Sequence, residues 1–122
     1  MDRKIAVSTG VNDDGNSITL MMHDSNTGEL LSFVSLETPE IEAIIEGLAD
    51  HRAKLPDEVP RELDPGTRLK TIEDPIWRTK NIPETNSVLL ALRHPGIGWI
   101  AAQMPKASAR SLGEFLMKAT ED

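Results

Sequence analysis

The stretch ITLMMHDSNTGELLSFVSLETPEIEAIIEGL (residues 18–48) decides the fold of this chain, because its pattern returns 68 residues later. It predicts a strand, a Gly-containing turn, a second strand and then a helix. Residues 86–116, NSVLLALRHPGIGWIAAQMPKASARSLGEFL, follow the same order. We therefore predict two copies of one structural unit.

The apolar residues on one side of each predicted helix fall at corresponding positions in the two copies. Its apolar positions in the first copy are Ile41, Ile44, Ile45 and Leu48. A shift of 68 residues places them on Ala109, Leu112, Gly113 and Leu116. The same shift places Gly28 on Gly96 and Glu46 on Glu114, but few residues are identical, so what the copies share is a pattern. We expect Ile44 and Leu112 to occupy equivalent core positions, each facing a sheet.

Alternating residues and turn signals predict three strands before each helix. The predicted strands cover residues 4–8, 17–23, 30–36, 67–72 with 76–80, 87–93 and 98–104. The predicted helices cover about 38–54 and 106–119, and Pro95-Gly96 suits the middle of a type II turn. We predict an α+β fold: two pseudo-symmetric βββα units that form one antiparallel sheet of about six strands, with both helices packed on one face.

The length of 122 residues suits a single domain, 1–122. We predict pseudo-repeats at about 3–54 and 68–120, joined by a Pro-rich connector over 55–66. The chain has no Cys, and the apolar run after its first four residues is too short for a signal peptide or a membrane span. We expect a cytoplasmic protein of bacterial type that does not contact a membrane.

The formal net charge of −7 argues against nucleic acid as the main partner, because such binding depends on Lys and Arg neutralising phosphates. The charge is uneven. Residues 1–60 carry four basic and twelve acidic residues, which gives −8, and residues 61–122 carry nine and eight, which gives +1. This asymmetry favours docking between unlike halves of two molecules, although a solvated acidic face is the simpler explanation.

No catalytic, metal-binding or cofactor motif is visible. His23, His51 and His94 lack a second ligand at metal-binding spacing, and the Asp-rich loop at 12–16 lacks the first ligand and the bidentate Glu of a helical calcium-binding loop. There is no phosphate loop, no serine elbow and no dinucleotide fingerprint. We therefore predict no enzymatic activity, no metal and no cofactor.

Basic residues gather on two predicted strands of the second half. The candidates for a basic face are Arg68, Lys70, Arg78 and Lys80. On the first helix, acidic residues stand at four-residue spacing (Glu42, Glu46, Asp50), opposite the apolar stripe. The two sets could pair across a subunit boundary or face solvent, and the basic set could meet an anionic ligand.

The predicted strands are apolar on both faces. Helices that cover one face leave large apolar side chains on the other, and an apolar patch of this size rarely stays exposed to solvent on a soluble monomer. Either the sheet closes into a barrel around these side chains or a second molecule covers them. The interface candidates are Met21, Leu31, Phe33, Leu89 and Trp99.

The order of strands followed by a helix, occurring twice, is similar to that of the repeats of the Pur-alpha and Whirly single-stranded nucleic-acid binders. Those repeats have four strands each, whereas three are predicted here. The resemblance covers topology and no motif, and it implies no site residue.

These observations predict a homodimeric protein whose role is interaction, as an adaptor, regulator or inhibitor that binds another protein. The dimer is expected to form through the sheet face that carries Leu89 and Trp99. The alternative is a module that binds a ligand or single-stranded nucleic acid on the basic face, with Trp77 as a stacking platform.

Overall fold

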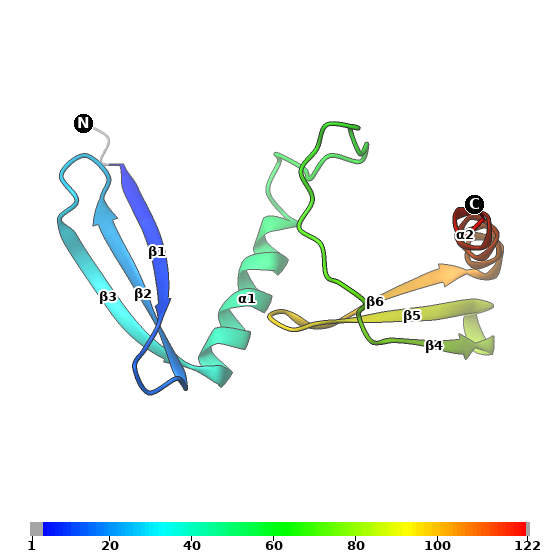
Figure 1. Ribbon diagram of the computed structural model, residues 1–122, viewed down its shortest axis with the longest axis horizontal. Coiled ribbons are helices and arrows are strands. Elements are labelled where there is room, and N and C mark those ends of the chain that lie inside the picture. The colour runs from blue at the N-terminus through cyan, green and yellow to red at the C-terminus, as the bar shows by residue number, and fades with distance from the viewer. Residues whose placement is uncertain (1–3, 122) are drawn as a thin grey trace. The chain divides into compact units, whose positions relative to one another are not determined.

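The structure is a computed structural model that describes residues 4–121, in two compact units that divide between Leu63 and Asp64. Each unit is a three-stranded antiparallel sheet followed by one helix (Figure 1). The predicted start of the first repeat, residue 3, lies outside the described residues. The predicted α+β fold with two βββα units is confirmed.

Unit 1 contains β1 (Ile5–Val11), β2 (Ser17–Asp24), β3 (Leu30–Glu37) and α1 (Thr38–Arg52). The strands pair in chain order, and the register sets Leu20 opposite both Thr9 and Val34. Because neighbours in register lie on the same side of a sheet, each face can be assigned from these pairs. A β-bulge at Met22 and His23 shifts the register near the end of β2.

Unit 2 contains β4 (Trp77–Ile82), a 3₁₀ turn (Pro83–Thr85), β5 (Ser87–His94), β6 (Gly98–Pro105) and α2 (Lys106–Ala119). Its strands also pair in chain order, with Leu90 opposite both Thr79 and Ala102. Leu30 and Gly98 begin β3 and β6, and Thr38 and Lys106 begin α1 and α2. Both separations are 68 residues, as the sequence pattern predicts.

The prediction of one six-stranded sheet is wrong, because the strands form two separate three-stranded sheets. Within a unit, paired strands are joined by short turns, whereas residues 38–76 separate β3 from β4. The predicted strand over 67–72 is also absent, since that segment has no regular structure. Asp74 has a φ of 42° directly before Pro75, and β4 begins only at Trp77.

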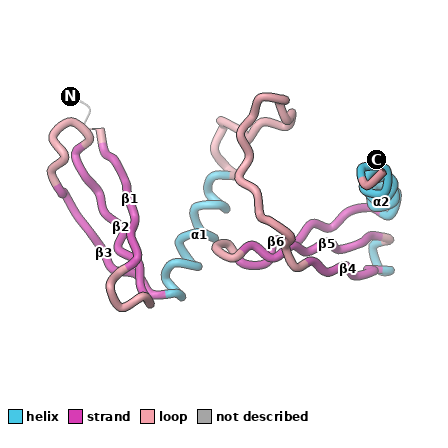
Figure 2. Tube along the Cα trace, viewed as in Figure 1, coloured by secondary structure: helices cyan, strands magenta, loops and turns pink. Residues whose placement is uncertain are grey.

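Neither unit encloses a core in the described part of the chain. No apolar side chain over residues 4–121 is buried, and the one buried residue there is Ser87, at 4 % exposure. The expected core position Ile44 is 37 % exposed, and Leu112 is half-buried. The main strand contact of α1 is β3, whereas α2 contacts both β5 and β6; Figure 2 shows α1 leaving the end of β3 and staying apart from β1 and β2. The apolar surfaces of both units therefore remain largely uncovered.

Candidate interaction surfaces

An apolar groove lies between the sheet of unit 2 and α2, and we call it the helix-side groove. It has a volume of about 480 Å³. Its lining comes from all three strands and from one face of α2: Trp77, Thr79, Val88, Leu90, Leu92, Met104, Ala109, Leu112, Gly113 and Leu116. Because no charged side chain lines it, the groove suits an apolar occupant.

The opposite side of the same sheet, its outer face, combines apolar and basic side chains. Leu89 and Trp99 point to this side, since both alternate with residues that line the groove. The register sets Trp99 opposite Arg93, and it sets Lys80 opposite Leu89. Trp99 is 53 % exposed. The outer face of unit 2 is therefore both apolar and positively charged.

The predicted basic residues do not all lie together. Arg78 and Lys80 share the outer face, because they alternate with Trp77 and Thr79 along β4. Arg68 and Lys70 belong to the irregular segment before β4.

Trp77, the stacking platform considered for the basic face, lines the groove on the other side of the sheet. Trp99 is the aromatic side chain that shares a face with Arg78 and Lys80. Sequence reasoning missed Arg93, although its alternation with Leu89 and Ala91 in the predicted strand could have revealed it.

Two of the interface candidates of unit 1, Met21 and Phe33, share one face of its sheet, which we call the outer face of unit 1. Met21 stands opposite Phe33 in the register, whereas Leu31 lies at the β-bulge, where the register passes from Ser32 to Leu30. Phe33 is 67 % exposed, whereas Met21 and Leu31 are half-buried. One end of this face is polar, because Asn12 donates hydrogen bonds to the hydroxyls of Ser17 (2.7 Å) and Ser35 (2.8 Å).

Asp14 supports the turn beside this polar end. Its carboxylate accepts hydrogen bonds from the backbone N–H of Asn16 (2.9 Å) and from the Ser17 hydroxyl (3.1 Å). The hydrogen bonds from the Asn16 N–H and then from the Ser17 hydroxyl lower the pKa of Asp14 below its ordinary value. Since Asp14 is fully exposed, the arrangement shapes a turn and encloses no ligand site.

A second hydrogen-bonded cluster sits where β5 begins. Gln103 donates to the hydroxyls of Thr85 (3.1 Å) and Ser87 (3.0 Å), and these two hydroxyls also bond each other. Asn86, with a φ of 52°, turns the chain between them. Because these side chains hydrogen-bond to one another, the cluster links the beginning of β5 to the end of β6.

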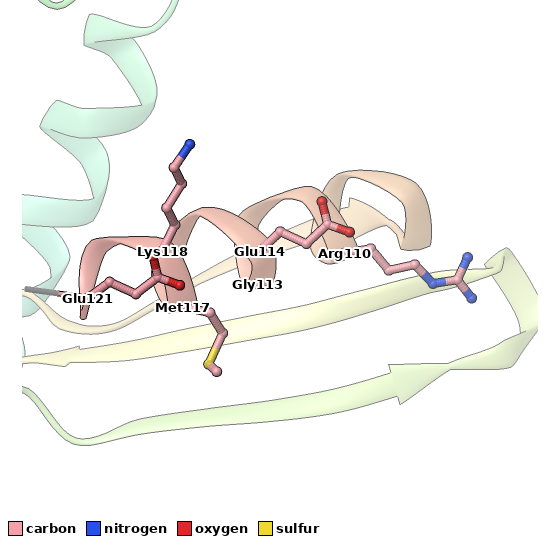
Figure 3. Close-up of a pocket in the computed structure, with 6 residues that line it drawn as sticks. All are labelled: Arg110, Gly113, Glu114, Met117, Lys118 and Glu121. Atoms are coloured by element: carbon pink, nitrogen blue, oxygen red, sulfur yellow. The ribbon is translucent and has the colours of Figure 1, made fainter.

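The outer flank of α2 carries a shallow hollow. Figure 3 shows the side chains that line it, with Lys118 extending above the helix and Met117 below it in that view. All of them come from α2 and the residues that follow it: Arg110, Gly113, Glu114, Met117, Lys118 and Glu121. A hollow built from one helical segment has no opposing wall, so it offers little to hold a ligand.

The histidines and acidic residues of the described part of the chain form no metal-binding cluster. No group of three or more His, Asp or Glu side chains there is arranged to hold a metal ion. His94 accepts two backbone hydrogen bonds in its own turn, from Gly96 and Ile97. In the same range, no helix has the length and apolar character to cross a membrane.

Comparisons with protein-family models, with curated proteins and with solved structures find no match to this chain.

Proposed function

We propose that this chain is an interaction protein that associates with a second copy of itself and, as a homodimer, binds another protein. The observation that supports the proposal is the absence of any buried apolar side chain over residues 4–121. Burying one large apolar side chain contributes about 1.5–3 kcal/mol. Surfaces as uncovered as the groove and the two outer faces gain stability when another molecule covers them.

Self-association is tested by light scattering after size exclusion, at several protein concentrations. We expect twice the chain mass of 13.4 kDa. The mass should decrease towards that of one chain on dilution, because a dimer dissociates by mass action. A chain that keeps the mass of one copy at every concentration would contradict the proposal.

Binding of a protein partner is tested by affinity capture from the native host with the wild type and a matched pair of variants. Phe33→Lys puts a charge on the outer face of unit 1, whereas Arg61→Glu changes an exposed side chain that ion-pairs Glu58 in the segment between α1 and β4. We expect a captured protein to be retained by Arg61→Glu and lost with Phe33→Lys. Equal retention by the two variants would speak against the outer face as a partner surface.

Single-stranded nucleic acid is the second candidate partner, and one observation favours it. Arg78, Lys80 and Arg93 share the outer face of unit 2 with Trp99, which is a basic surface with an exposed aromatic ring. The net charge of −7 opposes it, since the acidic residues repel a polyanion that comes within a Debye length of about 8 Å, beyond which salt screens the repulsion.

Anisotropy titrations with labelled single-stranded DNA and RNA at low salt decide between the two partners. We expect only weak binding. Tight binding that weakens steeply with added salt, and that is lost when Arg78, Lys80 and Arg93 are changed to Glu, would make nucleic acid the main partner. The matched control changes Arg68 and Lys70 to Glu, which alters the charge in the irregular segment without touching the sheet.

A further inference from the structure

We propose that two copies of this chain pair along the open edge of β1, antiparallel about a two-fold axis at Ser8, so that their unit 1 sheets join into one continuous sheet. This inference rests on the homodimer proposed above and adds where its two copies meet. The contact involves unit 1 alone, because both of its sides are the same strand.

The edge of β1 is accessible along its whole length. This strand lies at one side of the unit 1 sheet, and within the described residues its strand partner is β2 (Figure 1). All seven of its residues are exposed, and Val7 and Val11 are 61 % and 72 % exposed. The main strand contact of α1 is β3, on the opposite side of the sheet. An open edge of this kind presents N–H and C=O groups that can pair with another strand.

Hydrogen bonds at the two ends of β1 show which of its residues direct their backbone to the open edge. The Asn12 N–H donates to the Ser17 carbonyl (2.9 Å), and the Lys4 carbonyl accepts from the Ser25 N–H (3.0 Å). Bonded pairs recur at every second residue of an antiparallel ladder, so the even-numbered residues of β1 face β2. The odd-numbered residues therefore direct their N–H and C=O groups to the open edge: Ile5, Val7, Thr9 and Val11.

The other edge strands of the described chain carry features that hinder pairing with a further strand. Arg78 and Lys80 place charges on β4, and β6 ends at Pro105 and contacts α2. The β2–β3 pair is bulged, and β3 contacts α1. In contrast, β1 has no charged residue and no Pro, and its register with β2 is unbroken. Since charges, Pro, bulges and covering helices are what protect sheet edges, β1 is the unprotected edge.

The sequence of β1 matches itself when it is reversed about Ser8. With Ser8 opposite Ser8 of the second copy, all seven residues of each strand overlap. Odd-numbered residues then meet odd-numbered residues, so the backbone groups at the edge fall into bonded pairs. The side chains set opposite each other are also of one kind, being large and apolar, small, or β-branched: Ile5 with Val11, Ala6 with Gly10, and Val7 with Thr9. Matched cross-strand pairs stabilise a sheet, so a second β1 is the strand that fits this edge.

Opposite charges meet at both ends of the paired strands. In this register Lys4 of one copy stands opposite Asn12 of the other, next to the turn that carries Asp13 and Asp14. The two-fold axis repeats the contact at the other end. It counters the repulsion between two acidic units, because residues 1–60 carry a net charge of −8.

This contact closes on itself. Each copy offers one β1, and the two-fold axis uses both, so neither is left open. The edges of the joined sheet are then the two β3 strands, which α1 contacts. The proposal therefore predicts dimers and no longer chains.

The register is tested with single cysteines, since the chain has no Cys of its own. Ser8→Cys should form a disulfide-linked dimer under mild oxidation. Its two copies would be a non-bonded pair with Cα atoms about 4.5 Å apart, within the range of about 4.4–6.8 Å that a disulfide spans. Ala6→Cys is the matched control on the same face. Its two copies lie four residues out of register, so we expect at least tenfold less product.

A mixture of two variants tests the same register independently. Ala6→Cys in one chain and Gly10→Cys in a second chain of different tag length stand opposite each other in the proposed pairing. We expect a product that contains one of each chain, with little product from either variant alone.

A charge on the edge tests the contact in the dimer without cysteines. Val7→Lys should weaken dimerisation at least tenfold in light scattering, because it places a charge at the seam between the two strands. Ser32→Lys is the matched control. It adds the same charge in the same row of the sheet, since Met22 stands opposite both Val7 and Ser32, but on β3. Ser32→Lys and Trp99→Lys should leave the dimer mass unchanged.

The remaining outcomes separate this contact from the homodimer itself. A dimer that gives equal product from Ser8→Cys and Ala6→Cys, or one that Trp99→Lys abolishes, overturns pairing through β1 and leaves the proposed homodimer standing. Preferential linkage of Ser8→Cys to Ala6→Cys overturns the two-fold axis at Ser8. A strict monomer overturns both proposals.

Discussion

One histidine and one glycine direct the backbone through the turn between β5 and β6. The His94 Nδ1 atom accepts hydrogen bonds from the backbone N–H groups of Gly96 (2.9 Å) and Ile97 (3.0 Å). The left-handed conformation falls on Gly98, whose φ is 93°. A type II turn centred on Pro95-Gly96 would instead need a positive φ at Gly96, so this prediction from the sequence is wrong. The pattern of residues cannot show that an imidazole will act as the acceptor inside the turn.

Replacement of Gly98 with Ala should therefore destabilise unit 2 by about 1 kcal/mol or more, because a Cβ atom strains a backbone at this φ. Gly96→Ala is the matched control. Gly96 does not have a positive φ, and its added Cβ would meet the His94 ring at 3.4 Å, close to ordinary contact. Urea unfolding of the two variants measures the difference. A larger loss from Gly96→Ala would mean that the turn has a different shape.

At the scale of elements, both helices and most strands could be predicted, because their patterns are long and end at clear signals. The helix of the first copy was predicted to end at about residue 54 and ends at Arg52, and the hairpin of β5 and β6 was predicted within one residue of its observed bounds. The prediction of a strand over 67–72 is wrong. Alternation over a short stretch beside Pro75 does not show whether a neighbouring strand exists to pair with it. A stripe of apolar residues also could not predict how a helix packs on its sheet. Ile44 and Leu112 are equivalent in the pattern, yet their helices contact different sets of strands.

This difference between the helices leads to a prediction for α2. Leu112 is half-buried against the groove, so Leu112→Ala should lower the free energy of unfolding by about 1–2 kcal/mol, less than a fully enclosed leucine would cost. Glu114→Ala, which changes an exposed residue on the flank of the same helix, should be nearly neutral. Thermal or urea unfolding at one fixed protein concentration measures both. If Glu114→Ala proves the more damaging change, α2 does not face the sheet through Leu112.

At the scale of the whole molecule, the number of sheets could not be predicted from local patterns. Six strands with matching alternation are compatible with one sheet or with two, and the choice depends on pairing across residues 38–76. The outer-face residues Leu89 and Trp99 could be identified from alternation alone. The helix-side groove could not, because it depends on how α2 is placed against the three strands, with Ala109 and Gly113 in its lining.

The order in which the strands pair bears on how the chain folds as it is synthesised. Every pair in the sheet of unit 1 joins residues no more than 20 apart, the widest being Ser17 with Glu37. Contacts this local form rapidly, and a growing polypeptide folds from its N-terminal side first. The local pairing therefore lets unit 1 fold before unit 2 is complete, with Ile44 and Leu48 of α1 still exposed.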